Sequence, residues 1–146
     1  MPSALVVGAS VAGLVTAYRL ARSGWDVVII DSSVAPPEHH VVPTGPGLEA
    51  ARRMHIPPLG ELRDKLAIRC GTSVRAQEPD RFGVTVTFSS GDDEWFDLVV
   101  DTAARFGRLD DSLAIYAAEL LGDAFDIFRD FGEALSWWDQ ELHKVT

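Results

Sequence analysis

The stretch that decides the fold runs from Val6 to Asp31 and reads VVGASVAGLVTAYRLARSGWDVVIID. It predicts a strand over 4–8, a turn of small residues, a helix over 11–23, and a buried strand over 26–31 that ends in an acid. This order is typical of the phosphate-binding half of a dinucleotide-binding fold. We therefore expect an α/β, Rossmann-like, three-layer fold in which these two strands are adjacent and parallel.

The turn and the first helical residues are the expected phosphate site: Gly8, Ser10, Val11, Ala12 and Gly13. Gly8 permits a tight turn after the strand, and Gly13 permits the helix to approach the sheet closely. Backbone N–H groups at the start of the helix can face a pyrophosphate, assisted by the helix dipole. Ser10 replaces the middle glycine of the usual G-x-G-x-x-G pattern. Its side chain would either crowd the ligand or donate a hydrogen bond to it.

Asp31 ends the second strand, about 20 residues after the glycine turn, where an acid can accept hydrogen bonds from an adenosine ribose. The same carboxylate would repel a 2′-phosphate, so NADP is disfavoured. The alternative is the same fold without a bound nucleotide, because a fold by itself does not establish a function.

The chain has 146 residues and a net charge of −9. We expect one domain, with a nucleotide-binding core over 1–108 and a helical segment over 109–146. The acidic balance and the lack of a basic cluster disfavour nucleic acid as a partner. No segment is long and apolar enough for a membrane span. A single cysteine, Cys70, excludes an internal disulfide and fits a cytoplasmic location.

The hydrophobic periodicity of the remaining sequence changes twice, from helical to alternating and back to helical. A proline-rich loop over 32–47 precedes short helices over 48–55 and 60–66. Segments 72–77, 82–89 and 95–100 then predict a small antiparallel β-meander whose last strand returns to the parallel sheet. From 110 to 143 the period is helical, as one long helix or as two joined near Gly122 or Gly132. Its aromatic stripe is explained by core packing or, where exposed, by dimerisation.

With these elements in order, residues 4–100 resemble the FAD-dependent aromatic-ring monooxygenases of the para-hydroxybenzoate hydroxylase type. The run from Gly8 to Gly13, followed by Asp31, is similar to the first FAD motif of that family. Segment 61–66 resembles its arginine-x-x-leucine helix, which implies that Arg63 lies near the FAD pyrophosphate. Segment 84–100 resembles its meander and the next strand. The resemblance implies FAD as the cofactor.

After residue 100 the resemblance fails. The family continues with Gly-Ala-Asp-Gly, whereas this chain has Asp101-Thr102-Ala103-Ala104. Segment 122–124, Gly-Asp-Ala, resembles a third FAD motif, but it lies within a helical period, which favours coincidence. The large substrate-binding sheet of the family is also missing. The chain therefore resembles a truncated or minimal member of the family.

Three functions remain open from the sequence. The first is a minimal FAD-binding flavoprotein, an oxidoreductase or a component of one, completed by a dimer or a companion oxygenase. The second is a redox-inactive cyclase or isomerase of natural-product biosynthesis that has lost FAD and binds a small-molecule substrate in the same cleft. Its acid–base candidates are His39 and Asp101, together with Asp31. The third is a non-catalytic partner subunit. The scattered histidines predict no metal site.

The helical segment 110–143 also predicts a homodimer. Its apolar residues occupy two flanks, and the sheet of the same chain is expected to cover only one of them. A symmetric interface through the second flank is the simplest solution.

Overall fold

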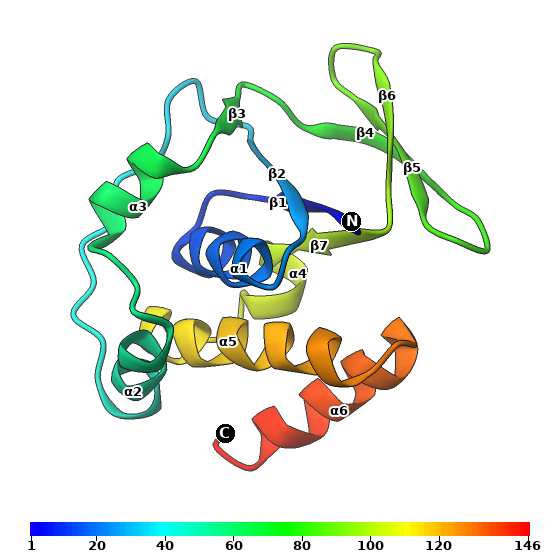
Figure 1. Ribbon diagram of the computed structural model, residues 1–146. Helices are drawn as coiled ribbons and strands as arrows, with labels where there is room; N and C mark the ends of the chain where they lie inside the picture. The colour runs from blue at the N-terminus through cyan, green and yellow to red at the C-terminus, as the bar shows by residue number, and fades with distance from the viewer.

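A parallel sheet of four strands forms the centre of the protein in the computed structural model, which describes residues 1–146 (Figure 1). Its order is β3-β2-β1-β7, with β1 at Ser3–Val7, β2 at Asp26–Asp31, β3 at Ile68–Cys70 and β7 at Leu98–Asp101. Strands β1 and β2 are adjacent and parallel, with Val6 paired to Ile29. The helix α1 (Val11–Arg22) connects them, so this sequence prediction is confirmed.

Five further helices follow α1: α2 (Gly45–Met54), α3 (Leu59–Lys65), α4 (Thr102–Phe106), α5 (Asp111–Ile127) and α6 (Phe131–His143). Helices α2 and α3 correspond to the predicted helices 48–55 and 60–66. The short α4 was not predicted. It begins directly after β7 because Asp101 caps it, accepting a hydrogen bond from the N–H of Ala104 (3.3 Å).

The meander contains β4 (Val74–Pro79), β5 (Val84–Phe88) and β6 (Asp93–Phe96), paired antiparallel in that order. The segment 95–100, predicted as one strand, is divided between β6 and β7. Asp97 lies at the division and accepts a hydrogen bond from the N–H of Ser3 (2.7 Å), which ties the crossing to the start of β1. The meander and its return to the parallel sheet are as predicted, whereas β3 was too short for its pattern to be recognised.

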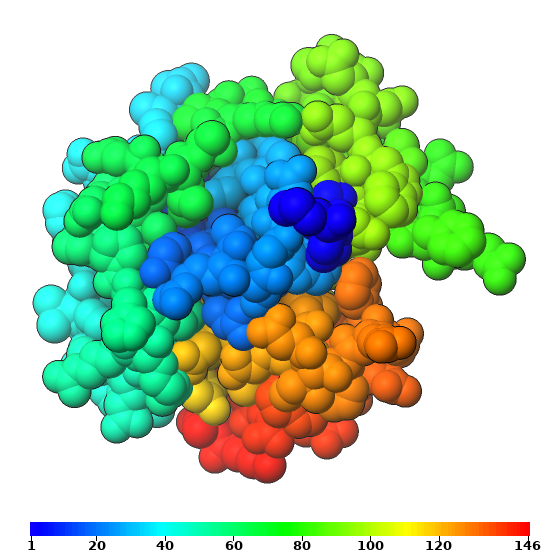
Figure 2. Space-filling view, in the orientation of Figure 1, coloured from blue at the N-terminus to red at the C-terminus, as the bar shows by residue number.

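The fold has three layers because the side chains of the parallel sheet alternate between two faces, and both faces are apolar. Ala4 and Val6 of β1 face the helices, whereas Leu5 packs against Val86 and Phe88 of the meander. Figure 2 shows the meander, in green, extending beyond the rest of the surface. The three-layer α/β fold expected from the sequence is therefore present, with helices on one face of the parallel sheet and the meander on the other.

The C-terminal segment forms two helices, and the break lies at residues 128–130, just before Gly132. Asp130 caps α6 by accepting a hydrogen bond from the N–H of Glu133 (3.0 Å). Helix α6 then folds back along α5, where the indole Nε1 of Trp138 donates to the carbonyl of Ala117 (2.8 Å). Gly122 lies inside α5 and causes no break.

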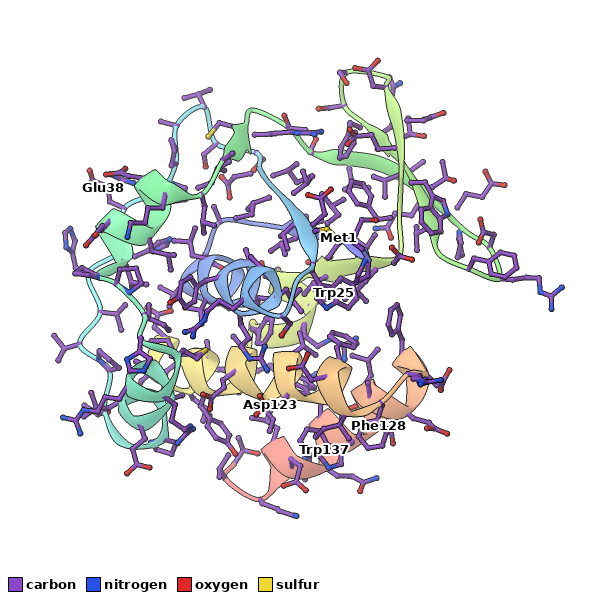
Figure 3. All side chains as sticks on the ribbon, viewed as in Figure 1. Met1, Trp25, Glu38, Asp123, Phe128 and Trp137 are labelled. Carbon is purple, nitrogen blue, oxygen red and sulfur yellow. The ribbon has the colours of Figure 1, made fainter.

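Because α6 folds back on α5, the argument that two apolar flanks of the helical segment require a homodimer does not hold. The face of α5 that was expected to need a second chain is covered instead by α6 and its aromatic side chains. Figure 3 shows Phe128 beside Trp137 at this contact, with ring centroids 5.9 Å apart, and Trp25 above α5. Trp25 packs at 5.7 Å against Phe125, which joins the helical segment to the core of the parallel sheet. The homodimer stays a prediction, without this support.

Candidate functional site

An open cleft of about 490 Å³ lies where the carboxyl ends of β1, β2 and β7 meet. This is the edge at which open α/β sheets bind ligands. Five of the sequence-predicted site residues line the cleft: Gly8, Ser10, Ala12, Asp31 and His39. The structure therefore brings together the glycine turn, the acid after β2 and one of the two catalytic candidates.

The glycine turn brings α1 into very close contact with the end of β1. Gly8 has a φ of +102°, which favours glycine, and its N–H donates to the carbonyl of Ile30 (2.9 Å). A Cβ added at Gly13 would lie 1.9 Å from the carbonyl oxygen of Gly8. Both glycines are thus required by the backbone geometry itself, as the sequence predicted for this turn.

Ser10 is the N-cap of α1, and its hydroxyl turns back toward the helix. The N–H of Gly13 donates to Ser10 Oγ (3.1 Å), and Thr102 Oγ1 lies 3.4 Å from the same atom. The hydroxyl thus satisfies one of the helix-start N–H groups, which a glycine at this position would leave for a ligand. Val11 contributes only its backbone, because its side chain is buried.

Asp31 holds the loop after β2 against the glycine turn. Its carboxylate accepts hydrogen bonds from the N–H groups of Ala9 and Ser33, both at 2.9 Å. Partial burial alone would raise the pKa of Asp31, but these hydrogen bonds outweigh it and hold the pKa below its ordinary value. The ionised carboxylate has further acceptor capacity for ribose hydroxyls.

His39 reaches the cleft from the loop between β2 and α2. Its Nε2–H donates to the carbonyl of Ala9 (2.9 Å). Asp31 therefore binds the N–H of Ala9, and His39 binds the carbonyl of the same residue. The imidazole is half-buried, whereas His40 is exposed. The side chains of Asp31 and His39 are therefore both anchored to Ala9, and both line the cleft.

Two of the predicted residues lie outside this cleft. Arg63, on α3, lines an adjoining hollow of about 380 Å³ and lies 3.6 Å from Glu38, which Figure 3 shows beside α3. The hollow shares Pro37 and His39 with the cleft, so Arg63 lies next to the cleft without lining it. Asp101 caps α4 and borders a different groove beside β7.

Sequence reasoning missed the residues of the third wall. Thr102 follows β7 directly, is almost fully buried, and donates from Oγ1 to the carbonyl of Val7 (2.7 Å). Its position after a predicted parallel strand was the available signal, because the carboxyl ends of such strands meet at one edge. Phe106 and Asp111 also line the cleft. They arrive there through the packing of α4 and α5, which no local pattern encodes.

The Gly122-Asp123-Ala124 triplet lies inside α5, as its periodicity predicted, and serves helix packing. Gly122 faces the side chain of Arg19 on α1, and the Arg19 guanidinium is 2.8 Å from Asp123. Figure 3 places Asp123 on α5. No group of three or more His, Cys, Asp and Glu side chains has metal-binding geometry, and none of the helices could cross a membrane.

Comparison with known proteins agrees with this geometry. Residues 6–35 match the family model of the NAD(P)-binding Rossmann-like domain. No curated protein matches the sequence of this chain.

Solved structures of similar fold include the tetracycline destructase Tet(51), with 18% sequence identity, a TM-score of 0.57, and coverage of 68% of this chain and 37% of that one. HpxO from Klebsiella pneumoniae, complexed with FAD and uric acid, has 20% sequence identity and a TM-score of 0.54. The match covers 67% of this chain and 38% of that one. The 2,6-dihydroxypyridine-3-hydroxylase from Arthrobacter nicotinovorans has 15% sequence identity and a TM-score of 0.57. The match covers 73% of this chain and 40% of that one. At these identities the likeness establishes the fold alone. The chain spans well under half the length of each.

Proposed function

We propose that this chain is a minimal FAD-binding flavoprotein related to flavin-dependent monooxygenases, acting as an oxidoreductase or as a component of one. The observation that carries the proposal is the cleft itself, in which the glycine turn, the start of α1 and Asp31 converge as a dinucleotide requires. The similarity in fold to HpxO, which was solved with FAD, supports the choice of FAD among dinucleotides.

The residues present fit the adenosine diphosphate half of the cofactor. The start of α1 offers N–H groups to a pyrophosphate, and Asp31 offers a charged acceptor to the ribose. No lysine or arginine lines the cleft, so the helix start must carry most of the phosphate binding. Asp111, on the opposite wall, carries a negative charge and favours a pyrophosphate position close to α1. When bound, FAD would supply the redox chemistry, while the protein supplies binding and orientation.

A binding titration tests this proposal. We expect purified protein to bind FAD, with a change in flavin absorbance or fluorescence, and to bind NADP⁺ more weakly than NAD⁺ because of Asp31. Asp31→Ala removes charge-assisted hydrogen bonds worth about 1.5–3 kcal/mol, so the Kd for FAD should rise by about 10- to 150-fold.

Asp26→Ala is the matched control, because Asp26 is an exposed acid at the opposite end of the same strand. It should leave the Kd for FAD unchanged. Equal affinity of the Asp31→Ala variant and the unmodified chain would contradict the assignment of the ribose site.

The adjacency of His39 and Asp31 favours a second candidate function, a redox-inactive cyclase or isomerase that uses the cleft for a small-molecule substrate. An imidazole beside a carboxylate is suited to proton transfer. A folded protein whose melting temperature responds to none of FAD, NAD⁺ and ADP-ribose would favour this candidate over the flavoprotein. A rise in melting temperature with FAD would favour the flavoprotein.

A further inference from the structure

Beside the cleft lies a second pocket, of about 590 Å³, which the helices after β7 form among themselves. Its lining comes mainly from α4, the turn into α5, the first turn of α5 and the C-terminal half of α6. This helical pocket and the cleft share only Leu109, and neither the glycine turn nor Asp31 lines it. It is therefore separate from the proposed nucleotide site.

The floor of the helical pocket is apolar and aliphatic. Three leucines contribute to it, Leu109, Leu113 and Leu142, and each of them is only partly exposed. Trp138 also lines the pocket, but its side chain is 2% exposed, and its indole Nε1 donates to the carbonyl of Ala117. The apolar surface that a ligand can reach therefore belongs mainly to the leucines.

Arg105 lies in this pocket over the ring of Trp138, with its guanidinium carbon 5.4 Å from the ring centroid. Stacking of this kind holds the planar guanidinium in place and leaves its N–H groups free. The half-buried arginines of the chain are Arg19, Arg63 and Arg105. The first two pair with acids, whereas Arg105 forms no ion pair. Arg105 therefore keeps its hydrogen-bond donors available for an anion from outside the chain.

The other charged groups of the helical pocket decide which kind of anion fits. Arg108 is exposed and also forms no ion pair, so it can join Arg105 at the same anion. Two acids line the pocket as well: Asp110, which caps α5, and Asp139, which is exposed beside His143. Because these acids balance the two arginines, the pocket gains little from a second negative charge on the ligand. A monoanion is therefore favoured over a dianion such as phosphate.

We propose that the helical pocket binds a small aliphatic monocarboxylate. The carboxylate would pair with Arg105 and Arg108, because a guanidinium group matches the two oxygens of a carboxylate. The hydrocarbon chain would cover the leucine floor and remove that surface from water. This inference does not depend on FAD binding, because the residues that carry it line the helical pocket alone.

Isothermal titration calorimetry with octanoate tests the proposal on the unmodified chain. We expect saturable binding with a Kd below about 1 mM. The affinity should fall by up to about fourfold for each CH₂ group removed, on going from octanoate to hexanoate and butyrate. Octan-1-ol has the same chain length without the carboxylate, and it should bind at least about tenfold more weakly.

Variants of single arginines locate the site. Arg105→Gln removes the stacked cation and should raise the Kd for octanoate by at least about tenfold. Arg108→Gln changes an exposed residue and should raise the Kd severalfold, which keeps the test valid if Arg105→Gln folds poorly. Arg75→Gln is the matched control, because Arg75 is an exposed arginine of β4 that forms no ion pair and lies outside the pocket. It should leave the Kd unchanged.

Three results would overturn the proposal. The first is the absence of saturable octanoate binding, or equal binding of octanoate and octan-1-ol. The second is the same Kd for octanoate in Arg105→Gln, Arg108→Gln and Arg75→Gln. The third is competition between octanoate and FAD for one site, which would place octanoate in the cleft. Failure of the chain to bind FAD would instead contradict the flavoprotein proposal and leave the helical pocket unaffected.

Discussion

The close approach of α1 to the glycine turn predicts that Gly13→Ala destabilises the protein, although alanine is the better helix former. Gly13 lies inside α1, where alanine is favoured over glycine by about 1 kcal/mol. The new Cβ would lie 1.9 Å from the carbonyl oxygen of Gly8. That oxygen belongs to the backbone and cannot rotate away, so the start of α1 must move. Overpacking of this kind costs about 1–3 kcal/mol.

Taking the upper end of that range for a backbone contact, we expect a net loss of about 2 kcal/mol in the free energy of unfolding. Gly60→Ala is the matched control, because Gly60 is exposed in α3 and an added Cβ would meet no atom within 4 Å. That variant should gain up to about 1 kcal/mol. Urea denaturation followed by circular dichroism measures both changes.

The displaced helix start should also weaken FAD binding in Gly13→Ala but not in Gly60→Ala, as a fluorescence titration would measure. A Gly13→Ala variant as stable as Gly60→Ala, with unchanged FAD affinity, would refute the reasoning. It would mean that the turn relaxes freely and that the close approach contributes nothing to the fold or to the site.

Three further predictions follow from the structure. Because hydrogen bonds lower the pKa of Asp31 in the folded state, its ionised form stabilises the fold at neutral pH. The difference in the free energy of unfolding between the unmodified chain and Asp31→Asn, measured by urea denaturation, should therefore shrink as the pH falls from about 7 to about 3. A difference that stays constant over this range would contradict the role of Asp31. The isolated chain should not hydroxylate aromatic compounds with NADPH, because no Asp-Gly follows β7 and the cleft is open; turnover with tightly bound FAD would overturn this. Phe128→Glu, at the α5–α6 contact, should lower the melting temperature because it places a charge against Trp137; an unchanged melting temperature in a thermal melt followed by circular dichroism would contradict this.

The sequence by itself determined the local elements and the half of the site that they build. The glycine turn, the α1 helix and the two flanking strands are encoded by short-range patterns, namely apolar periodicity and a glycine where φ is positive. Asp31 could be assigned because it ends one of those strands. The meander and the helical C-terminus were also readable, since their periods of alternation differ.

Only the tertiary structure decided what lies opposite the glycine turn. Thr102 and Asp111 reach the cleft through the pairing of β7 with β1 and the packing of α5 on α1, and Arg63 is held just outside it on α3. The fold-back of α6 and the helical pocket that it forms with α4 and α5 are likewise long-range outcomes. A hydrophobic period specifies that a surface must be buried, but not which distant segment buries it, because that choice depends on the combined packing of the whole chain.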